Sequence, residues 1–364
     1  MPARSAPASR SAPTAPLARI RATGALCAVG GSSDQVSAAV RAGICRYAET
    51  ARIDRNLDRL RMALVPEDVL EPLNPEVDGL GLNDRYRRTL RLAAHALQQI
   101  AAQAGDLARI PMLLALPEPA GAPPPSGLLP ALQKQAGVAF DERRSLLLPN
   151  GRAGALLALE HAAPLFEQGA EYVMVGGADT YSDSRWLDQL ESEGRLLTRR
   201  SLDGFVPGEG AAFLLLAPAP RRAPAGAAAG AITLVAAASA EEPEHFYAQG
   251  RATGEGLANC FENLRAAPVA QPPVRSIWAG FNGEGFWAKE WGVARLRHAD
   301  LFDPSAEIQH PADCYGDLGA ATGAMLMVLA ERAMSMSGGG ASPALVFASS
   351  DRETRGCVTM TATG

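Results

Sequence analysis

Few residues of this 364-residue chain combine the types and spacing that catalysis needs. Cys314 lies between Asp313 and Asp317, next to the start of an apolar segment. Nearby negative charges raise the pKa of a thiol, and a thiol in that state is a poor nucleophile. We therefore expect Cys314 to be a small buried residue rather than a catalytic one.

Hydroxyl and imidazole groups give no clearer catalytic pattern. Ser349 and Ser350 precede Asp351, but no histidine in the sequence is paired with them as a Ser-His-Asp triad would require. His161 follows Glu160 in a segment with helical character, yet no second histidine follows at the spacing of a zinc protease. The sequence predicts neither a metal site nor a cofactor.

The composition narrows the class of protein. A net charge of −5 and a pI near 5.7 argue against a nucleic-acid surface, and 47% hydrophobic with 20% charged residues is typical of a globular chain. No apolar run approaches the roughly 18 residues of a membrane span. The five cysteines are odd in number and contain no CxxC pair, which predicts no disulfide framework and fits a reducing cytoplasm.

The elements that must position any site alternate along the chain. Helical periodicity marks 84–104, and the segments 153–168 and 320–334 are apolar nearly all round, as buried helices are. Short apolar runs predict strands at 26–30, 111–116, 172–175, 212–216, 232–238, 277–281, 344–348 and 357–361. Buried helices between apolar strands indicate a layered α/β fold.

Proline and glycine divide this pattern into parts. We expect a disordered tail at 1–15, a first half at 16–216, a linker at 217–230 and a second half at 231–364. The run at 118–127 predicts a surface loop.

Two motifs carry a resemblance to a known family. Residues 203–212 read DGFVPGEGAA, and residues 172–179 read YVMVGGAD. At this spacing they resemble the β-ketoacyl synthases of the thiolase superfamily, and the similarity extends from about Arg19 to the end of the chain. The resemblance implies a thiolase-like five-layer αβαβα fold built from two similar halves.

The same resemblance implies that the catalytic residues are substituted. The family's nucleophilic cysteine, which begins a buried helix, falls at Gly151 or Arg152, and no cysteine lies between Cys45 and Cys260. Asn282 takes the place of the first catalytic histidine and Asp317 that of the second. Ala312 takes the place of the lysine, and the glycine-rich gate near residues 348–351 also looks lost. The carboxylate of Asp317, at the position of the second histidine, would repel a forming oxyanion.

Several residues could form a remodelled pocket at these positions. Arg152 and Asp317 would meet as an ion pair if the helix start faces the 312–321 loop, and Arg199 and Arg200 are further candidate partners for Asp317 or for a carboxylate ligand. The aromatic residues Phe286, Trp287 and Trp291 flank Glu284 and Glu290, either as core and dimer-edge packing or as a pocket floor. The candidate pocket residues are Arg152, Phe205, Asn282, Glu284, Cys314, Asp317, Ser349 and Ser350.

The sequence leaves the function open between classes. The first hypothesis is a catalytically degenerate scaffold or adaptor, by analogy with thiolase-like proteins beside bacterial secretion genes. The second is an accessory subunit of a ketosynthase heterodimer, and the third is an active acyltransferase with relocated residues. Binding of an acyl-carrier protein without reaction is a weaker fourth. The family implies a homodimer or heterodimer through a strand pairing that Pro149 would weaken.

Overall fold

The computed structural model describes residues 16–119, 123–219, 231–250, 253–267, 273–337 and 341–362. The expected tail at 1–15 and most of the expected linker, from 220 on, lie outside the described residues, as do residues 120–122 of the expected loop. No helix in the described part of the chain is long and apolar enough to cross a membrane.

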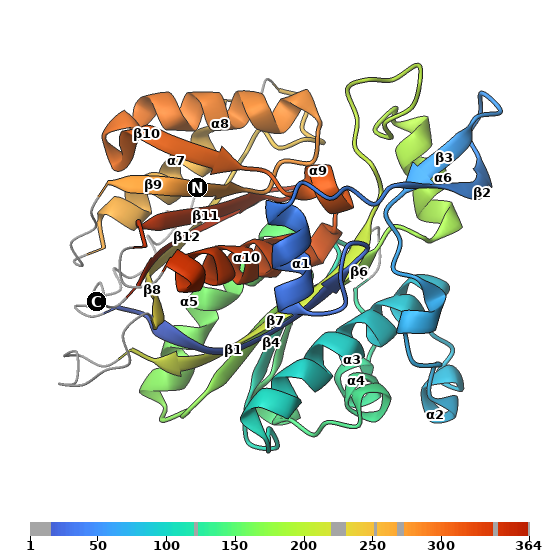
Figure 1. The fold of residues 1–364 in the computed structure, drawn as a ribbon, viewed down its shortest axis with the longest axis horizontal. Helices are drawn as coiled ribbons and strands as arrows, with labels where there is room; N and C mark the ends of the chain where they lie inside the picture. Colours follow the sequence, from blue (N-terminus) through green and yellow to red (C-terminus); the bar gives the residue numbers. More distant parts are fainter. Residues whose placement is uncertain are drawn as a thin grey trace, which may run out of the picture.

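Helices and strands form five layers, which Figure 1 shows from bottom to top. Helices α3 and α4 form one outer layer, α5 and α10 form the central layer, and α7 and α8 form the other outer layer, with strands between them. The helices are α1 Ser33–Arg41, α2 Pro75–Asp78, α3 Asp84–Ala104, α4 Leu128–Ala136, α5 Gly154–Glu167, α6 Ser184–Ser192, α7 Glu255–Arg265, α8 Gly285–Arg297, α9 Ala312–Tyr315 and α10 Thr322–Ser337.

The two halves of the chain repeat one strand topology. The strands are β1 Ala18–Cys27, β2 Ala48–Ile53, β3 Arg59–Met62, β4 Met112–Ala115, β5 Leu146–Leu148, β6 Val173–Thr180, β7 Glu209–Pro218, β8 Ile232–Glu241, β9 Val274–Ala279, β10 Phe302–Gln309, β11 Ala344–Ser349 and β12 Thr354–Ala362. The first half has the order β5-β4-β6-β7-β1, and the second has β10-β9-β11-β12-β8. Corresponding pairs are parallel or antiparallel alike, so the predicted similar halves are confirmed.

Close packing explains the Gly-Gly pair of β6. A Cβ built on Gly176 would lie 2.1 Å from the Phe213 ring, and one on Gly177 would lie 2.2 Å from the Ala320 carbonyl oxygen. Any side chain there would collide with β7 or with the turn that leads into α10. The Gly-Gly pair therefore lets the strands of the first half lie close to the helices of the central layer.

The other motif is held by a buried carboxylate. Glu209 is fully buried at the start of β7, where it accepts bonds from Arg88 Nη2 at 2.6 Å, from the Val65 N–H at 2.8 Å and from Thr180 Oγ1 at 2.7 Å. These bonds join β7 to α3 and to the chain after β3, so the motif also serves to lock the first half together.

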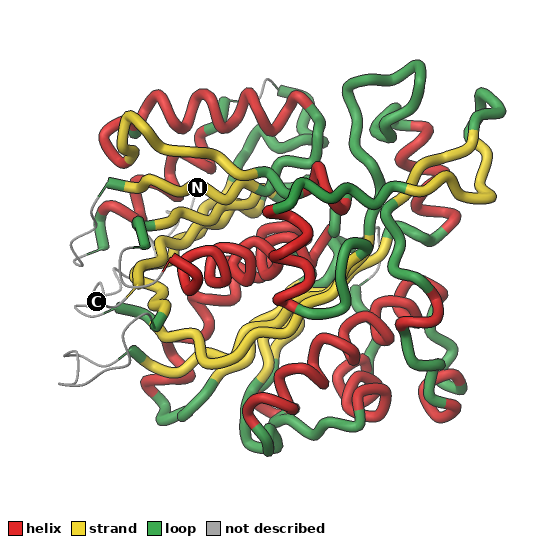
Figure 2. Tube along the Cα trace, viewed as in Figure 1, coloured by secondary structure: helices red, strands yellow, loops and turns green. Residues whose placement is uncertain are grey.

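One lobe of the fold that adjoins the site was not predicted from the sequence. The hairpin β2–β3, helix α6 and the chain around Leu196 and Phe205 form a lobe beside the layers, and Figure 2 shows how much of it is loop. Its core is small and includes Leu60, Met62, Tyr181, Leu187 and Leu190. The lobe matters because Phe205 and Tyr181 face the site described next.

Candidate functional site

The start of the central helix α5 is capped by a residue from the other half of the chain. Gly151–Ala153 forms a 3₁₀ turn that leads into α5. The Ala153 N–H donates to Ser350 Oγ at 2.9 Å, and the Ser350 hydroxyl donates in turn to the Asn150 carbonyl. One free donor of the helix start is thus satisfied by a buried hydroxyl.

Arg152 projects from this helix start into a buried set of charges. Its Nη1 donates to Asp317 at 2.8 Å, its Nη2 to Asp351 at 2.5 Å, and its Nε to the Ser349 carbonyl at 2.9 Å. The guanidinium also lies 4.4 Å from the Trp287 ring centroid, within cation–π range. The ion pair between Arg152 and Asp317 that the sequence suggested is therefore present.

Arg195 extends the same set of charges from the loop after α6. Its Nε and Nη2 donate to the two oxygens of Glu284 at 2.7 and 2.8 Å, a bidentate arrangement. Its Nη1 donates to Asp351 at 2.8 Å and to the Tyr247 hydroxyl at 2.9 Å. Asp351 therefore bridges two buried guanidinium groups.

Asn282 links two carboxylates from the second half of the chain, Asp317 and Glu284. Its Nδ2 donates to Asp317 at 2.8 Å and to Glu284 at 2.9 Å, and the Trp287 Nε1 donates to Glu284 at 3.0 Å. The Gly319 N–H donates to the other oxygen of Asp317 at 2.7 Å. We call this set the charge network; its members are Arg152, Arg195, Asn282, Glu284, Trp287, Asp317 and Asp351.

The two arginines of the charge network keep Asp351 ionised despite burial. Burial by itself would raise the pKa of Asp351, but the charges of Arg152 and Arg195 outweigh it and hold that pKa well below its usual range. Glu118 lies at the edge of the network and accepts the N–H groups of Asp351 and Arg352 at 3.2 and 3.0 Å. Burial, followed by the charge of Asp351, raises the pKa of Glu118 to about 7.

A second buried ion pair adjoins the network. Arg355 is fully buried and its Nε donates to Glu290 at 2.6 Å, while the Ser349 hydroxyl donates to the other oxygen of Glu290.

The two tryptophans that follow Glu284 have different surroundings. Trp287 faces Arg152, whereas Trp291 stacks on Phe347 at 4.8 Å within the core.

Little space remains around Asn282, Ala312 and Asp317. The cavity bordered by Arg152, Ala312 and Asp317, with Asn282 on its wall, holds only about 10 Å³, which is at most one water molecule. A larger cleft of about 230 Å³ is lined by Gly151, Arg152 and Asp351, together with Glu118, Tyr181 and Tyr247, among others. Arg152 therefore lines both the small cavity and the larger cleft.

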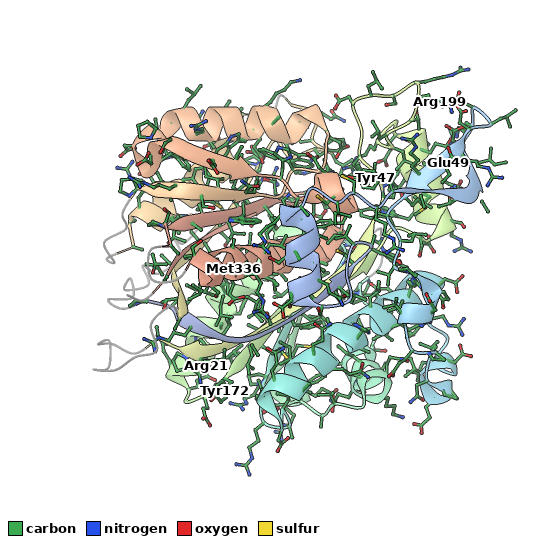
Figure 3. The ribbon with its side chains drawn as sticks, viewed as in Figure 1. Arg21, Tyr47, Glu49, Tyr172, Arg199 and Met336 are labelled. Atoms are coloured by element: carbon green, nitrogen blue, oxygen red, sulfur yellow. The ribbon has the colours of Figure 1, made fainter. Side chains whose placement is uncertain are left out.

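Two sequence-based assignments need correction. Arg199 is 78% exposed and its closest carboxylate partner is Asp58 at 3.7 Å, and Figure 3 shows it at the outer edge of the molecule. Arg195, four residues earlier, binds the network instead, and nothing in the local sequence distinguishes it. Among the described contacts, Arg200 is not paired with Asp317 either; its backbone N–H donates to Thr198 Oγ1 at 3.3 Å.

Cys314 is buried as expected but does not join the network. Its pKa is raised to about 11 by burial first, and then by the nearby thiol of Cys45 and the charge of Asp313, so the leading cause is burial rather than the two aspartates. Of the other candidate residues, Phe205 lies 5.4 Å from the Arg195 guanidinium, and Ser349 and Ser350 make the bonds given above. The predictions omitted Tyr247 and Arg355.

The layers, the repeated strand order and the motif positions define a thiolase-like fold of the ketosynthase type. No protein-family model matches the chain, and no curated protein does either. The chain is similar to solved structures at 11–18% sequence identity, and this similarity concerns the fold alone.

Three solved structures illustrate this similarity. The ishigamide ketosynthase/chain length factor is 18% identical, covers 96% of this chain and 100% of its own, and has a TM-score of 0.67. A ketosynthase in complex with its chain length factor from Xenorhabdus doucetiae is 16% identical, covers 98% and 100%, and has a TM-score of 0.69. The ketosynthase of module 6 of the bacillaene synthase from Bacillus subtilis is 12% identical, covers 95% and 72%, and has a TM-score of 0.72.

Proposed function

We propose that this chain is a catalytically degenerate ketosynthase-fold protein that works as a scaffold, adaptor or accessory subunit in the cytoplasm. The observation that carries the proposal is the placement of Arg152. Its guanidinium lies at the start of the central helix and is paired with Asp317 and Asp351. On the Asp317 side the adjoining cavity has room for one water, so a thioester could occupy that side only by displacing the Arg152–Asp317 ion pair.

The chemistry of the network supports the same conclusion. Thioester condensation needs a nucleophile and hydrogen-bond donors aimed at a forming oxyanion. Here the donors of Arg152 and Asn282 already bind carboxylates, and one of those carboxylates, Asp317, would repel an oxyanion. Breaking a buried ion pair leaves an unpaired charge and costs about 3–5 kcal/mol.

An accessory subunit beside a ketosynthase is the form of this proposal that the comparisons favour. Two of the similar structures are described as a ketosynthase with a chain length factor, and a third as a ketosynthase bound to an acyl-carrier protein. Edge strand β5 ends directly before Pro149 and leaves Leu146 40% exposed. We infer that this edge pairs with a second ketosynthase-like chain, either a copy of this one or an active partner.

The first test is intact-mass spectrometry of the purified protein after incubation with acyl-CoA and acyl-carrier thioesters. An active ketosynthase treated in parallel serves as the control for competent donors. We expect the control to gain an acyl group and this chain to stay unmodified. A stable adduct on Cys314 or on a serine would instead support an active acyltransferase with relocated residues.

A second test addresses the partner. The chain is co-expressed with ketosynthases encoded beside its gene, only one protein carries an affinity tag, and the eluate is analysed by size-exclusion chromatography with light scattering. We expect a stoichiometric heterodimer with one of them. A homodimer that excludes every ketosynthase would favour the scaffold over the accessory subunit.

A further inference from the structure

Two segments far apart in the sequence bring cysteines together at the surface. Cys45 lies on the exposed connection between α1 and β2, and Cys314 lies on the short helix α9. The N–H of Arg46 donates to the Cys314 carbonyl at 3.0 Å, and the Tyr47 hydroxyl donates to the Ala312 carbonyl at 2.7 Å. Figure 3 shows Tyr47 on this connection beside α9.

The spacing of these backbones suits a covalent link. The bond from the Arg46 N–H to the Cys314 carbonyl, at 3.0 Å, places the residue that follows Cys45 directly against Cys314 on helix α9. Disulfides join residues whose Cα atoms are about 4.4–6.8 Å apart. The Cys45 thiol lies near Cys314, since after burial it is the next cause that raises the pKa of Cys314, and its Sγ donates to the Gly43 carbonyl at 3.6 Å.

A second cysteine pair in the chain offers an internal comparison. Cys357 on β12 directs its Sγ to the Cys260 carbonyl on α7 at 3.5 Å, and both cysteines are completely buried. An oxidant in solution has no path to this pair in the folded protein. The difference between the pairs is access, because Cys45 is exposed and Cys260 is not.

We propose that Cys45 and Cys314 form a reversible disulfide that ties the connection between α1 and β2 to the loop that carries Asp317. The co-reactant is a small-molecule disulfide such as oxidised glutathione. Asp317 lies three residues after Cys314 in this loop and belongs to the charge network.

The reaction proceeds by two thiol–disulfide exchanges. The Cys45 thiolate attacks one sulfur of oxidised glutathione, forms a mixed disulfide and releases one glutathione thiolate, which takes up a proton. Cys314 then loses its proton, its thiolate attacks the Cys45 sulfur, and the second glutathione leaves as a thiolate and is protonated. Two protein thiols are oxidised and one glutathione disulfide is reduced to two glutathione molecules.

The disulfide would restrain the connection between α1 and β2 and the helix α9 without changing the core. The Arg46 and Tyr47 bonds already hold the connection against α9, and the covalent link would make that contact permanent in oxidising conditions. We expect amide hydrogen exchange to slow at least tenfold at residues 44–47 and 312–316 in the oxidised protein, with little change in the outer helices.

The test is oxidation of the full chain with oxidised glutathione at about pH 8.5, followed by alkylation of free thiols and non-reducing peptide mapping. We expect a peptide pair that contains Cys45 and Cys314, with Cys260 and Cys357 still reduced. Cys45→Ser and Cys314→Ser should each abolish it. Cys27→Ser, which removes the other cysteine near Cys314, should leave it in place.

Three results would overturn the proposal. One is a lasting glutathione adduct on Cys45 with Cys314 still free after prolonged incubation. Another is a link between Cys45 residues of two chains, and the third is a link from Cys314 to Cys27. Each outcome is read from the same peptide map, and the reduced protein after dithiothreitol treatment provides the baseline.

Discussion

Replacement of Arg152 by alanine tests the charge network most directly. Arg152→Ala removes the two ion pairs to Asp317 and Asp351, the bond to the Ser349 carbonyl and the contact with Trp287. Asp351 keeps Arg195 as a partner, whereas the described contacts leave Asp317 with only neutral donors. Loss of one partner from a buried pair costs about 3–5 kcal/mol.

That cost is a large share of the stability of an ordinary protein, which is about 5–15 kcal/mol. The assay is urea unfolding followed by circular dichroism, with the free energy of unfolding extrapolated to water. The matched control is Arg199→Ala, because Arg199 is also paired with an aspartate but is 78% exposed at 3.7 Å. We expect the control to change stability by less than about 0.5 kcal/mol.

A second variant separates unpaired charge from lost packing. Adding Asp317→Asn to Arg152→Ala removes the carboxylate that has lost its cation, so we expect the double variant to be more stable than the single one. An Arg152→Ala protein within about 1 kcal/mol of the wild type would refute the reasoning, as would a double variant that is less stable than the single one.

Three further predictions concern single positions. Because the folded-state pKa of Glu118 is about 7 and exceeds its unfolded value of about 4.3, folding becomes less favourable as the pH rises through this window, by about 4 kcal/mol in total. Glu118→Gln should remove that slope and be more stable than the wild type at pH 8 but not at pH 4, as measured by urea unfolding at both values. Gly177→Ala should lower the free energy of unfolding by at least about 1–3 kcal/mol, because its Cβ would meet the Ala320 carbonyl. Gly292→Ala, in open space on α8, should raise the free energy of unfolding by up to about 1 kcal/mol. Thermal unfolding should therefore show opposite shifts of Tm for the two variants. Arg355→Met should lower the free energy of unfolding by about 3–5 kcal/mol by leaving Glu290 buried without its cation, and adding Glu290→Gln should restore part of the loss.

Long periodic segments were the part of the fold that the sequence predicted best. The helix expected at 84–104 is α3, because Asn83 caps it and an unbroken apolar stripe packs it onto the first sheet. Strand β10 was missed, since Pro304 lies within it and its alternation of half-buried and exposed residues is confined to Ala306–Gln309. The hairpin β2–β3 was missed for a similar reason, as only one of its strands, β3, has alternate buried residues.

The repeated topology also could not be read from the sequence. The two halves share strand order and direction, yet the side chains that fill equivalent layers differ. At the site, the resemblance located Arg152 and Asp317 because their motifs have fixed spacing. Arg195 was missed because its partners lie 89 and 156 residues away, and only the tertiary fold brings them together.

The charge network also bears on the order in which the chain is synthesised. Its two arginines, Arg152 and Arg195, belong to the first half, and all three of their buried carboxylate partners, Glu284, Asp317 and Asp351, belong to the second. A nascent first half, which leaves the ribosome earlier, would hold two cations without counterions until the second half arrives. Those positive charges favour an open, unfinished intermediate, so completion of the buried ion pairs acts as a check that both halves are present.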